Sequence, residues 1–443
     1  MQIPSSPIRP VLKKLIVRGL KAVDARTAVG RAISRNGDQL IIGRRRYDLN
    51  RYERIVVVGA GKATAPMARA VEQRLGRWLD SGFVVVKYGH GAPTTRIEIA
   101  EAGHPVPDLS GQRAAAKLCA MAGELSRRDL LIVLLSGGAS SLLPAPVSGI
   151  TLADKQRTTE SLLRCGATIQ EINTVRKHLS RIKGGRLAEL TQATVVALIL
   201  SDVLGDDLSS IASGPTVPDP TTYQEAVAIL KRYHIWVMTP QRVRQHLTRG
   251  CQGLEVETPK PGSSIFRRVQ HHIVGSNAAA VAAVTRAARE AGLRTLVPTA
   301  AVTGEASASG RQLGAMAREM MCEGKPLQRP CCVVAGGETT VTVTGNGTGG
   351  RAQEFAAAAA LEIAGLAKVW VVAIGTDGTD GPTDAAGAVV DGDTLARAQH
   401  LSVDLTRALK HHNTYPALKK LKQLIVTGPT GTNVNDLYLL LLL

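Results

Sequence analysis

The sequence predicts an α/β protein in which a doubly wound parallel sheet is followed by a second, separate α/β domain. Three observations lead to this fold class. The chain has 443 residues, of which 44% are hydrophobic and only 3% aromatic, which is enough to build more than one core. Short apolar runs alternate with patterns of helical period, which favours strands connected by helices. Glycine-rich loops follow several of the apolar runs directly.

The first half of the chain contains four predicted strand-to-helix units. Each begins with a short apolar run that is bounded by turn residues, as is typical of buried parallel strands. The predicted strands are residues 54–59, 82–87, 129–135 and 194–200. Ligands of such sheets bind at the carboxyl ends of the strands, where the strand order reverses. The loops after these runs are therefore the expected location of a ligand site.

The turn after the first strand holds Gly59, Gly61 and Lys62. A glycine turn that opens a helix is a natural anion site, because the helix N-terminus carries partial positive charge. Thr64 stands where a dinucleotide fingerprint needs glycine or alanine, and no Walker A spacing is present. Lys62 lies at the start of a predicted helix, where the helix dipole disfavours a cation. Two explanations are open: the side chain is simply exposed to solvent, or it binds an anion.

Two further loops of this half are candidate ligand contacts. Ser136, Gly137 and Gly138 follow the third strand, and their N–H groups and hydroxyl are suited to a phosphate or carboxylate, although a plain turn is the alternative. Asp202 follows the fourth strand and is placed to bind a metal or a hydroxyl. Several cations between residues 172 and 186 are expected to line one side of a cleft.

The expected domains are residues 1–240 and 269–443, joined by a polar, basic and proline-bearing linker over 241–268. Two strand-like runs of the second domain each lead into a polar glycine-rich loop. These loops carry Glu338 with Arg351, and Asp377 with Asp380. Arg351 lies at a predicted helix start, where a cation is disfavoured, and its guanidinium suits a phosphate or carboxylate. The aspartates are candidate metal ligands or a simple turn.

Composition narrows the classes of partner. The net charge is +18, yet Lys and Arg are spread thinly and no aromatic platform accompanies them, so nucleic acid is not an expected partner. No apolar run is long enough for a membrane helix, and the terminal LYLLLLL is expected to be a closing strand or packed tail. The six scattered cysteines suggest free thiols, and we expect a cytoplasmic protein.

Eight motifs together resemble the type 2 glycerate kinases, whose C-terminal domain is named MOFRL. They keep the family's order from about residue 9 to 440. They are VVGAGKA, EAGHPVPD, LSGGASSLLPAP, INTVRKHLSRIKGGRLA, LSDVLGDDLSSIASGPTVPD, GGETTVTVTGNGTGGRAQE, GTDGTDGPTDAAGAVVDG and GPTGTNVNDL. Ala352 departs from the family's usual GGRNQE, and the SGGAS loop from SGGGS.

The resemblance implies ATP-dependent phosphorylation of D-glycerate at its 2-hydroxyl, with a divalent cation such as Mg²⁺. It implies a Rossmann-like first domain, a MOFRL second domain, and an active site in the cleft between the domains. Lys62 and Arg351 match the positions regarded as essential in the family. The remaining candidate contacts to substrate or ATP are Gly59, Gly61, Ser136, Gly137, Gly138, Ser140, Glu338, Asn433 and Asn435. The candidate metal ligands are Asp202, Asp377 and Asp380, any one of which is alternatively the base.

A second enzymatic activity is compatible with the glycine turn, and the oligomeric state is not predicted by the sequence. The glycine turn could serve a nicotinamide cofactor in a hydroxypyruvate reductase, although Thr64 and Lys62 argue against that. The partners expected are the small molecules D-glycerate and ATP, with a homodimer left open. Alanine at Lys62 or Arg351 is expected to abolish turnover and leave the thermal melt nearly unchanged.

Overall fold

The computed structural model describes residues 1–5 and 7–443. Contacts divide the chain into two compact units. The first, which we call the parallel-sheet unit, is residues 25–274. The second, the mixed-sheet unit, is residues 275–443 together with residues 1–24. Both units are α/β, as the sequence predicts.

The parallel-sheet unit is built on a six-stranded sheet with the order β6-β5-β4-β7-β8-β9. Its strands are β4 (Arg54–Ala60), β5 (Ser81–Lys87), β6 (Ile97–Ala102), β7 (Asp129–Leu135), β8 (Thr194–Leu200) and β9 (Val269–Gly275). The pairs β4–β5, β5–β6, β4–β7 and β7–β8 are all parallel. The chain builds outward from β4 on one side and then returns to β7 on the other. The strand order therefore reverses between β4 and β7, where ligands bind in such sheets.

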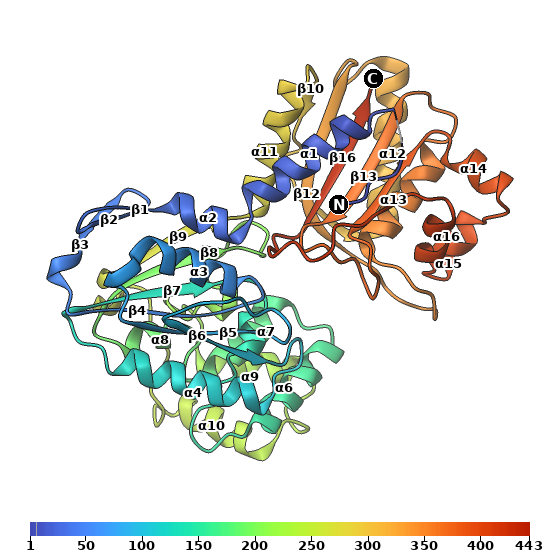
Figure 1. Ribbon diagram of the computed structural model, residues 1–443. Coiled ribbons are helices and arrows are strands. Elements are labelled where there is room, and N and C mark those ends of the chain that lie inside the picture. The colour runs from blue at the N-terminus through green and yellow to red at the C-terminus, as the bar shows by residue number, and fades with distance from the viewer. Residues whose placement is uncertain (6) are drawn as a thin grey trace. The chain divides into compact units, whose positions relative to one another are not determined.

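Helices cover this sheet on both faces (Figure 1). Every residue of β7 is buried, which explains why the run reads as continuously apolar rather than alternating. Alternate residues of β4, among them Val56 and Val58, pack against Ala115 and Leu118 of α4. The helices near the sheet are α2 (Ala25–Ala32), α3 (Thr64–Leu75), α4 (Leu109–Gly123), α5 (Ala139–Leu142) and α8 (Arg186–Leu190). A separate antiparallel sheet contains β1 (Ile33–Asn36), β2 (Gln39–Ile42) and β3 (Arg45–Asp48).

Four further helices of this unit share a second hydrophobic core. They are α6 (Leu152–Arg164), α7 (Ile169–His178), α9 (Tyr223–Arg232) and α10 (Gln241–Cys251). Three of them begin at a threonine capping box, formed by Thr151, Thr168 and Thr222. The contact division at residues 274 and 275 lies later than the linker expected over 241–268. That segment is polar and basic overall, but α10 buries Val243 and Leu247 against α9, so it belongs to the unit's core.

The mixed-sheet unit is built on a sheet with the order β10-β12-β16-β13-β14-β15, and β11 also pairs with β12. Its strands are β10 (Arg294–Leu296), β11 (Val302–Glu305), β12 (Cys331–Thr340), β13 (Val369–Gly375), β14 (Gly387–Asp391), β15 (Leu424–Ile425) and β16 (Asp436–Leu442). The terminal leucine run is β16, which lies between β12 and β13, antiparallel to both, with all seven residues buried. Its uniform hydrophobicity follows from burial on both faces.

The helices of the mixed-sheet unit cover both faces of its sheet (Figure 1). They are α1 (Arg9–Ala22), α11 (Asn277–Glu290), α12 (Ala306–Glu323), α13 (Arg351–Glu362), α14 (Thr394–His400), α15 (Leu405–Lys410) and α16 (Thr414–Lys420). The N-terminal helix α1 packs on α11, while α12 and α13 pack on each other and on the sheet. Within the described residues, no helix combines the length and the apolar character that crossing a membrane requires.

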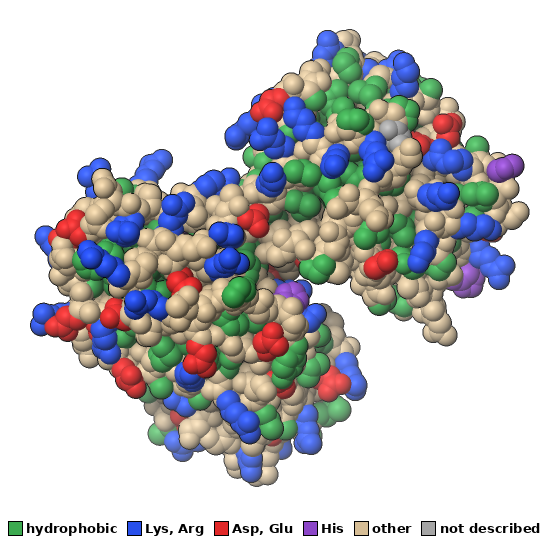
Figure 2. All heavy atoms as spheres, viewed as in Figure 1, with side chains coloured by type: hydrophobic (Ala, Val, Ile, Leu, Met, Phe, Trp, Pro, Cys, Tyr) green, Lys and Arg blue, Asp and Glu red, His purple; other side chains and the backbone are tan. Residues whose placement is uncertain are grey.

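Basic side chains are distributed over the surface. On the face in Figure 2, Lys and Arg side chains are scattered, with Asp and Glu side chains between them, and no single basic patch stands out. The net charge of +18 thus does not correspond to one concentrated basic surface on that face.

Candidate active site

The loops after β4 and β7 are joined by hydrogen bonds where the strand order reverses. The Lys62 N–H donates to the Gly137 carbonyl at 2.8 Å, and the Ala63 N–H donates to Ser136 Oγ at 3.0 Å. Gly61 has φ +140°, and a Cβ there would lie 2.1 Å from Ser136 Oγ. Only glycine fits this close approach. The predicted residues Gly59, Gly61, Lys62 and Ser136–Gly138 are therefore brought together.

The Ser136 hydroxyl is buried and hydrogen-bonded within the protein, whereas a ligand-binding hydroxyl would be accessible. Its side chain is 1% exposed and its Oγ also pairs with Thr64 Oγ1 at 3.0 Å. The hydroxyl thus holds the start of α3 against the β7 loop. Thr64, which spoils the dinucleotide fingerprint, is the partner that this hydroxyl needs, because a buried polar group is costly unless it is bonded.

His104 lies beside Lys62 at this point. A Cβ on Gly138 would meet the His104 ring at 2.8 Å and Lys62 Cγ at 3.5 Å. Burial lowers the pKa of His104 to about 4, and the positive charge of Lys62 acts in the same direction. The imidazole is therefore neutral at physiological pH. The Lys62 ammonium has no hydrogen-bond or ion-pair partner among residues 1–5 and 7–443, so it is available to an anion.

We expect His104 to show no titration between pH 5 and 8. The Lys62→Met variant should raise the pKa of His104, because one of the charges that lowers it is removed. Nuclear magnetic resonance of imidazole-labelled protein measures this directly, with His104→Gln assigning the signal among the ten histidines. A wild-type midpoint between 6 and 7 would show that the contact is not as described.

Ser140 begins a buried polar chain next to this loop. Its Oγ pairs with Ser213 Oγ at 2.7 Å, and the Ser213 hydroxyl donates to Asn173 Oδ1 at 3.0 Å. The Ser140 carbonyl accepts from Lys183 Nζ at 2.9 Å. Ser140 therefore connects the β7 loop to α7 and to the segment that follows it.

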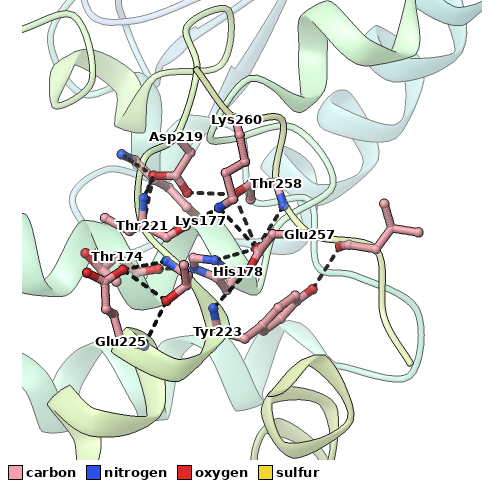
Figure 3. A network of polar contacts seen from close by, with 12 residues as sticks. Thr174, Lys177, His178, Asp219, Thr221, Tyr223, Glu225, Glu257, Thr258 and Lys260 are labelled. Atoms are coloured by element: carbon pink, nitrogen blue, oxygen red, sulfur yellow. Dashed lines mark hydrogen bonds and ion pairs between the residues drawn. The ribbon is translucent and has the colours of Figure 1, made fainter. Parts of the chain in front are cut away.

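The cations of residues 172–186 do not all face one cleft. Lys177 is buried and pairs with Asp219 at 3.2 Å, and His178 Nε2 lies 2.9 Å from Glu257 (Figure 3). These two side chains hold α7 to the segments 219–223 and 257–260. Lys177 and His178 are therefore not among the cations that could line a cleft, because helical spacing turns them to the interior. Arg176 and Lys183 instead line a pocket within this unit.

Replacing Glu257 by glutamine should lower the free energy of unfolding by about 1–3 kcal/mol, because buried His178 loses a charged partner. Burial alone would raise the pKa of Glu257, but His178 and the N–H groups of Thr258 and Tyr223 lower it to about 2. This stabilisation is full above about pH 4.5 and is lost as the pH falls toward 2.

Chemical denaturation of Glu257→Gln at pH 7 and at pH 3 measures this difference. Glu53→Gln is the matched control, since Glu53 pairs with Arg128 at an exposed site of the same unit. An equal effect of the two substitutions at pH 7 would contradict the structural role of Glu257.

Asp202 follows β8 by two residues and is half-buried, as its predicted position requires. It lies in the parallel-sheet unit, whereas Asp377 and Asp380 lie in the mixed-sheet unit.

Arg351 is the first residue of α13 and is held by two carboxylates. Its Nε and Nη2 donate to the two oxygens of Asp436 at 2.7 and 3.0 Å, and its Nη1 donates to Glu338 Oε1 at 2.6 Å. Burial alone would lower the pKa of Arg351, but Asp436 and Glu338 raise it above its ordinary value. The sequence predicted Glu338 and Arg351 as site residues, and the structure brings them together.

Asp436 is the partner that the sequence reasoning missed. It is 1% exposed and also accepts from the Tyr438 hydroxyl at 3.1 Å. Burial raises its pKa to about 6 although Arg351 opposes the shift. The signal in the sequence was a lone acid at the start of an otherwise apolar strand, because a buried acid there needs a cation.

Asp380 caps α13 and does not fit the role of metal ligand. Its two oxygens accept from the N–H groups of Ala352 and Gln353 at 3.0 and 2.8 Å. Gly350 must be glycine here, because a Cβ would lie 2.3 Å from the Asp380 carboxylate. Both oxygens are thus engaged, which corrects the expectation for Asp380. Ala352, which stands where the family usually has asparagine, is buried in the hydrophobic core of the mixed-sheet unit. Its side chain therefore makes no polar contact.

The other candidates of this unit lie in loops. Asp377 Oδ1 accepts from the N–H and hydroxyl of Thr379, which is a local turn that leaves its other oxygen to solvent or ligand. Asn435 is buried at φ +64°, and its carbonyl accepts from Thr376, while Asn433 is half-buried. No group of three or more His, Cys, Asp or Glu side chains that could hold a metal occurs in the described part of the chain.

Comparisons with known proteins find two family models that match successive parts of the chain. A model of a domain of unknown function (DUF4147) matches residues 11–248, and a model of the MOFRL family matches residues 331–436. A glycerate 2-kinase of Pyrococcus horikoshii is 42% identical over 97% of this chain and 96% of its own. A D-glycerate 2-kinase of Thermotoga maritima is 43% identical over 87% of this chain and 90% of its own.

A solved structure described as a glycerate kinase from Thermotoga maritima superimposes with a TM-score of 0.87. It is 39% identical and covers 98% of this chain and 99% of its own. A relative from Agrobacterium vitis, 45% identical over 88% of this chain and 87% of its own, carries the provisional name of a hydroxypyruvate reductase. Identity at this level along nearly the whole chain, in the same fold, establishes that the chain belongs to the type 2 glycerate kinase family.

Proposed function

We propose that the protein phosphorylates D-glycerate at its 2-hydroxyl, with ATP as donor, giving 2-phosphoglycerate and ADP. The observation that carries this is the Lys62 ammonium, which is without a partner among the described residues and sits on a turn bonded to Gly137. Phosphoryl transfer depends on positioning and on neutralising phosphate charge, and such a turn offers both. The glycerate kinase names of the relatives support the same reaction.

The parallel-sheet unit supports the nucleotide or phosphate part of this proposal. Its strand order reverses beside Lys62, which is the arrangement of a Rossmann-like sheet. We propose that Lys62 binds a phosphoryl oxygen and that the loop of Gly59, Gly61, Gly137 and Gly138 lets the ligand approach the backbone. Ser136 acts through the shape of this loop, because its hydroxyl is already bonded twice.

Arg351 contributes through a different arrangement. Its charge is offset by Glu338 and Asp436, so it attracts an anion only if one carboxylate yields. Glu338 is 42% exposed and Asp436 is 1% exposed, so Glu338 is the partner that can exchange for a ligand. We propose that Asp436 keeps the guanidinium oriented while Glu338 is displaced or turned toward the substrate. Both Lys62 and Arg351 are then needed for turnover.

A divalent cation such as Mg²⁺ is proposed to accompany the nucleotide. A magnesium ion commonly binds one or two carboxylates together with substrate phosphates, and Asp202 and Asp377 remain the proposed protein ligands. Asp380 is left out of this set because both of its oxygens accept hydrogen bonds from the start of α13. Asn433 and Asn435 remain proposed substrate contacts near the start of β16.

Two coupled assays test the proposed reaction against its rival. Release of ADP with D-glycerate and MgATP is expected, with loss of activity in the presence of a chelator. The rival is a hydroxypyruvate reductase, favoured by the name of the Agrobacterium vitis relative. Robust NAD(P)H oxidation with hydroxypyruvate, independent of ATP, would sink the kinase proposal. Light scattering would decide between a monomer and the homodimer, and fractionation would test the proposed cytoplasmic location.

A further inference from the structure

Four basic side chains line a pocket of about 660 Å³ that lies wholly within the parallel-sheet unit. Arg157 is exposed, and the other three are largely withdrawn from solvent. They are Lys155 on α6, Arg176 on α7 and Lys183 beyond α7. Lys155 shares one face of α6 with Leu152 and Thr159, which also line the pocket, as the spacing of three and four residues requires. A pocket of this volume is in the range of about 300–1,000 Å³ typical of small-molecule sites.

Lys155 and Lys183 are buried and Arg176 is half-buried, and none of the three is balanced by an acid among the described residues. Lys155 is 7% exposed, and its Nζ makes no hydrogen bond to any residue that the structure describes. Lys183 is 3% exposed, and its one hydrogen bond within that part of the chain goes to the Ser140 carbonyl. Among residues 1–5 and 7–443, no carboxylate forms an ion pair with Lys155, Arg176 or Lys183. Glu160, the acidic residue of the lining, is exposed and pairs with Arg164 at 2.7 Å.

Such an arrangement is unfavourable in the empty protein. Burial lowers the pKa of Lys155 to about 7 and, with the charges of Lys155 and Arg176, lowers the pKa of Lys183 well below its ordinary value. Buried charges without a partner destabilise a fold, and Lys177 in the same segment shows the usual solution, a bond to Asp219. Lys155, Arg176 and Lys183 thus face one pocket without an acid, and burial removes protons from the two lysines. This indicates that the missing negative charge comes from a ligand, whose binding would restore those protons.

We propose that this pocket binds the phosphate group of a small molecule. A phosphate offers three acceptor oxygens and up to two negative charges, which suits one guanidinium and two ammonium groups better than a planar carboxylate does. Ser140 and Ser141 add hydroxyls to the wall, and Pro105, Pro107 and Pro144 form an apolar side for the rest of the ligand.

The pocket adjoins the loop that holds Lys62. His104 lies against Gly138, and the next residue, Pro105, lines the pocket. Ser140 lies two residues beyond Gly138 and also lines it. That the ligand is a substrate or product rests on the proposed function, whereas the phosphate site itself does not.

The test is phosphate binding by the whole chain, measured by calorimetry and by the rise in melting temperature. Inorganic phosphate is the first probe, followed by competition with ADP and with 2-phosphoglycerate. Lys155→Met should raise the dissociation constant for inorganic phosphate about tenfold or more and remove most of the thermal shift. Lys231→Met, which removes a charge from an exposed site on α9, should leave both unchanged.

Arg176→Gln is the second variant, in case Lys155→Met fails to fold, and the same loss is expected. Competition by ADP would identify the nucleotide as the natural source, and competition by 2-phosphoglycerate the product; either supports the site. Wild-type phosphate affinity in a folded variant, or no binding to the wild type, would overturn it. Neither readout requires turnover, so failure of the site and failure of the proposed reaction are separable.

Discussion

Arg351→Ala is expected to lose turnover and also about 3–5 kcal/mol of stability, because it leaves the buried Asp436 without its cation. This revises the expectation of an unchanged thermal melt, which rested on a role of Arg351 in anion binding and did not include its bond to Asp436. The bidentate bond to Asp436, at 2.7 and 3.0 Å, ties α13 to the start of β16. The free energy of unfolding, measured by denaturant titration, is the first readout.

The pH dependence of this loss separates it from a general packing defect. Asp436 has a pKa raised to about 6, so below that pH it is increasingly protonated in the folded protein. Arg351 lowers that pKa, so its removal costs most where Asp436 would otherwise be ionised. The deficit of Arg351→Ala should therefore be larger at pH 8 than at pH 5. A pH-independent deficit, or none, would contradict the assignment.

A matched control is available in the same unit. Arg311 pairs with Glu362 at 3.2 Å on the surface, with its side chain 48% exposed. Arg311→Ala removes the same charge and is expected to change stability by at most about 0.5–1 kcal/mol. Arg351→Lys keeps the charge but loses the planar guanidinium that makes two hydrogen bonds to Asp436. Compared with Arg351→Ala, it should therefore recover part of the stability and little of the activity.

Lys62→Met should lower kcat by at least about 100-fold while the thermal melt stays within a degree or two of wild type. The loss follows because a positioned donor to developing phosphate charge commonly contributes about 10²–10³ in rate. The stability is spared because the turn is held by the backbone of Lys62 and by Ser136, not by the ammonium. Steady-state ADP release and differential scanning measure the two effects.

Lys231→Met is again the control for charge, since Lys231 is exposed on α9 and should leave kcat unchanged. Normal turnover by Lys62→Met would refute its catalytic role. A large fall in its melting temperature would instead mean that the lysine side chain supports the fold, contrary to its lack of bonded partners among the described residues.

Much of the parallel-sheet unit follows from local sequence. The runs that form β4, β7 and β8 are short, apolar and bounded by turn residues, so their type and approximate bounds follow from burial on both faces. Lys62 stood out because a cation is disfavoured in the first turn of a helix. The apolar runs, their turn residues and the position of Lys62 each depend on only a few neighbouring residues, so the sequence alone predicts them.

The rest depended on partners far away in the chain. The sequence predicts Ser136 as a ligand contact, but its hydroxyl is hydrogen-bonded to the Ala63 N–H and to the Thr64 hydroxyl. Asp380 looked like a metal ligand but caps α13 across nearly thirty residues. Asp436 lies 85 residues from its partner Arg351. The sequence predicts the segment of α10 to be a linker, because only the packing of the folded protein shows which of its residues are buried. Sequence spacing alone contains none of these pairings.

The position of β16 bears on how the protein is made. It lies between β12 and β13, yet it is synthesised after every other strand of its sheet. During translation the parallel-sheet unit can fold as soon as residues 25–274 have emerged, since domains generally fold in the order of synthesis. The edges of β12 and β13 stay unpaired until β16 arrives, and unpaired edges invite association with other chains. A ribosome that stalls before residue 436 would thus release a chain with one finished unit and one that is prone to aggregate.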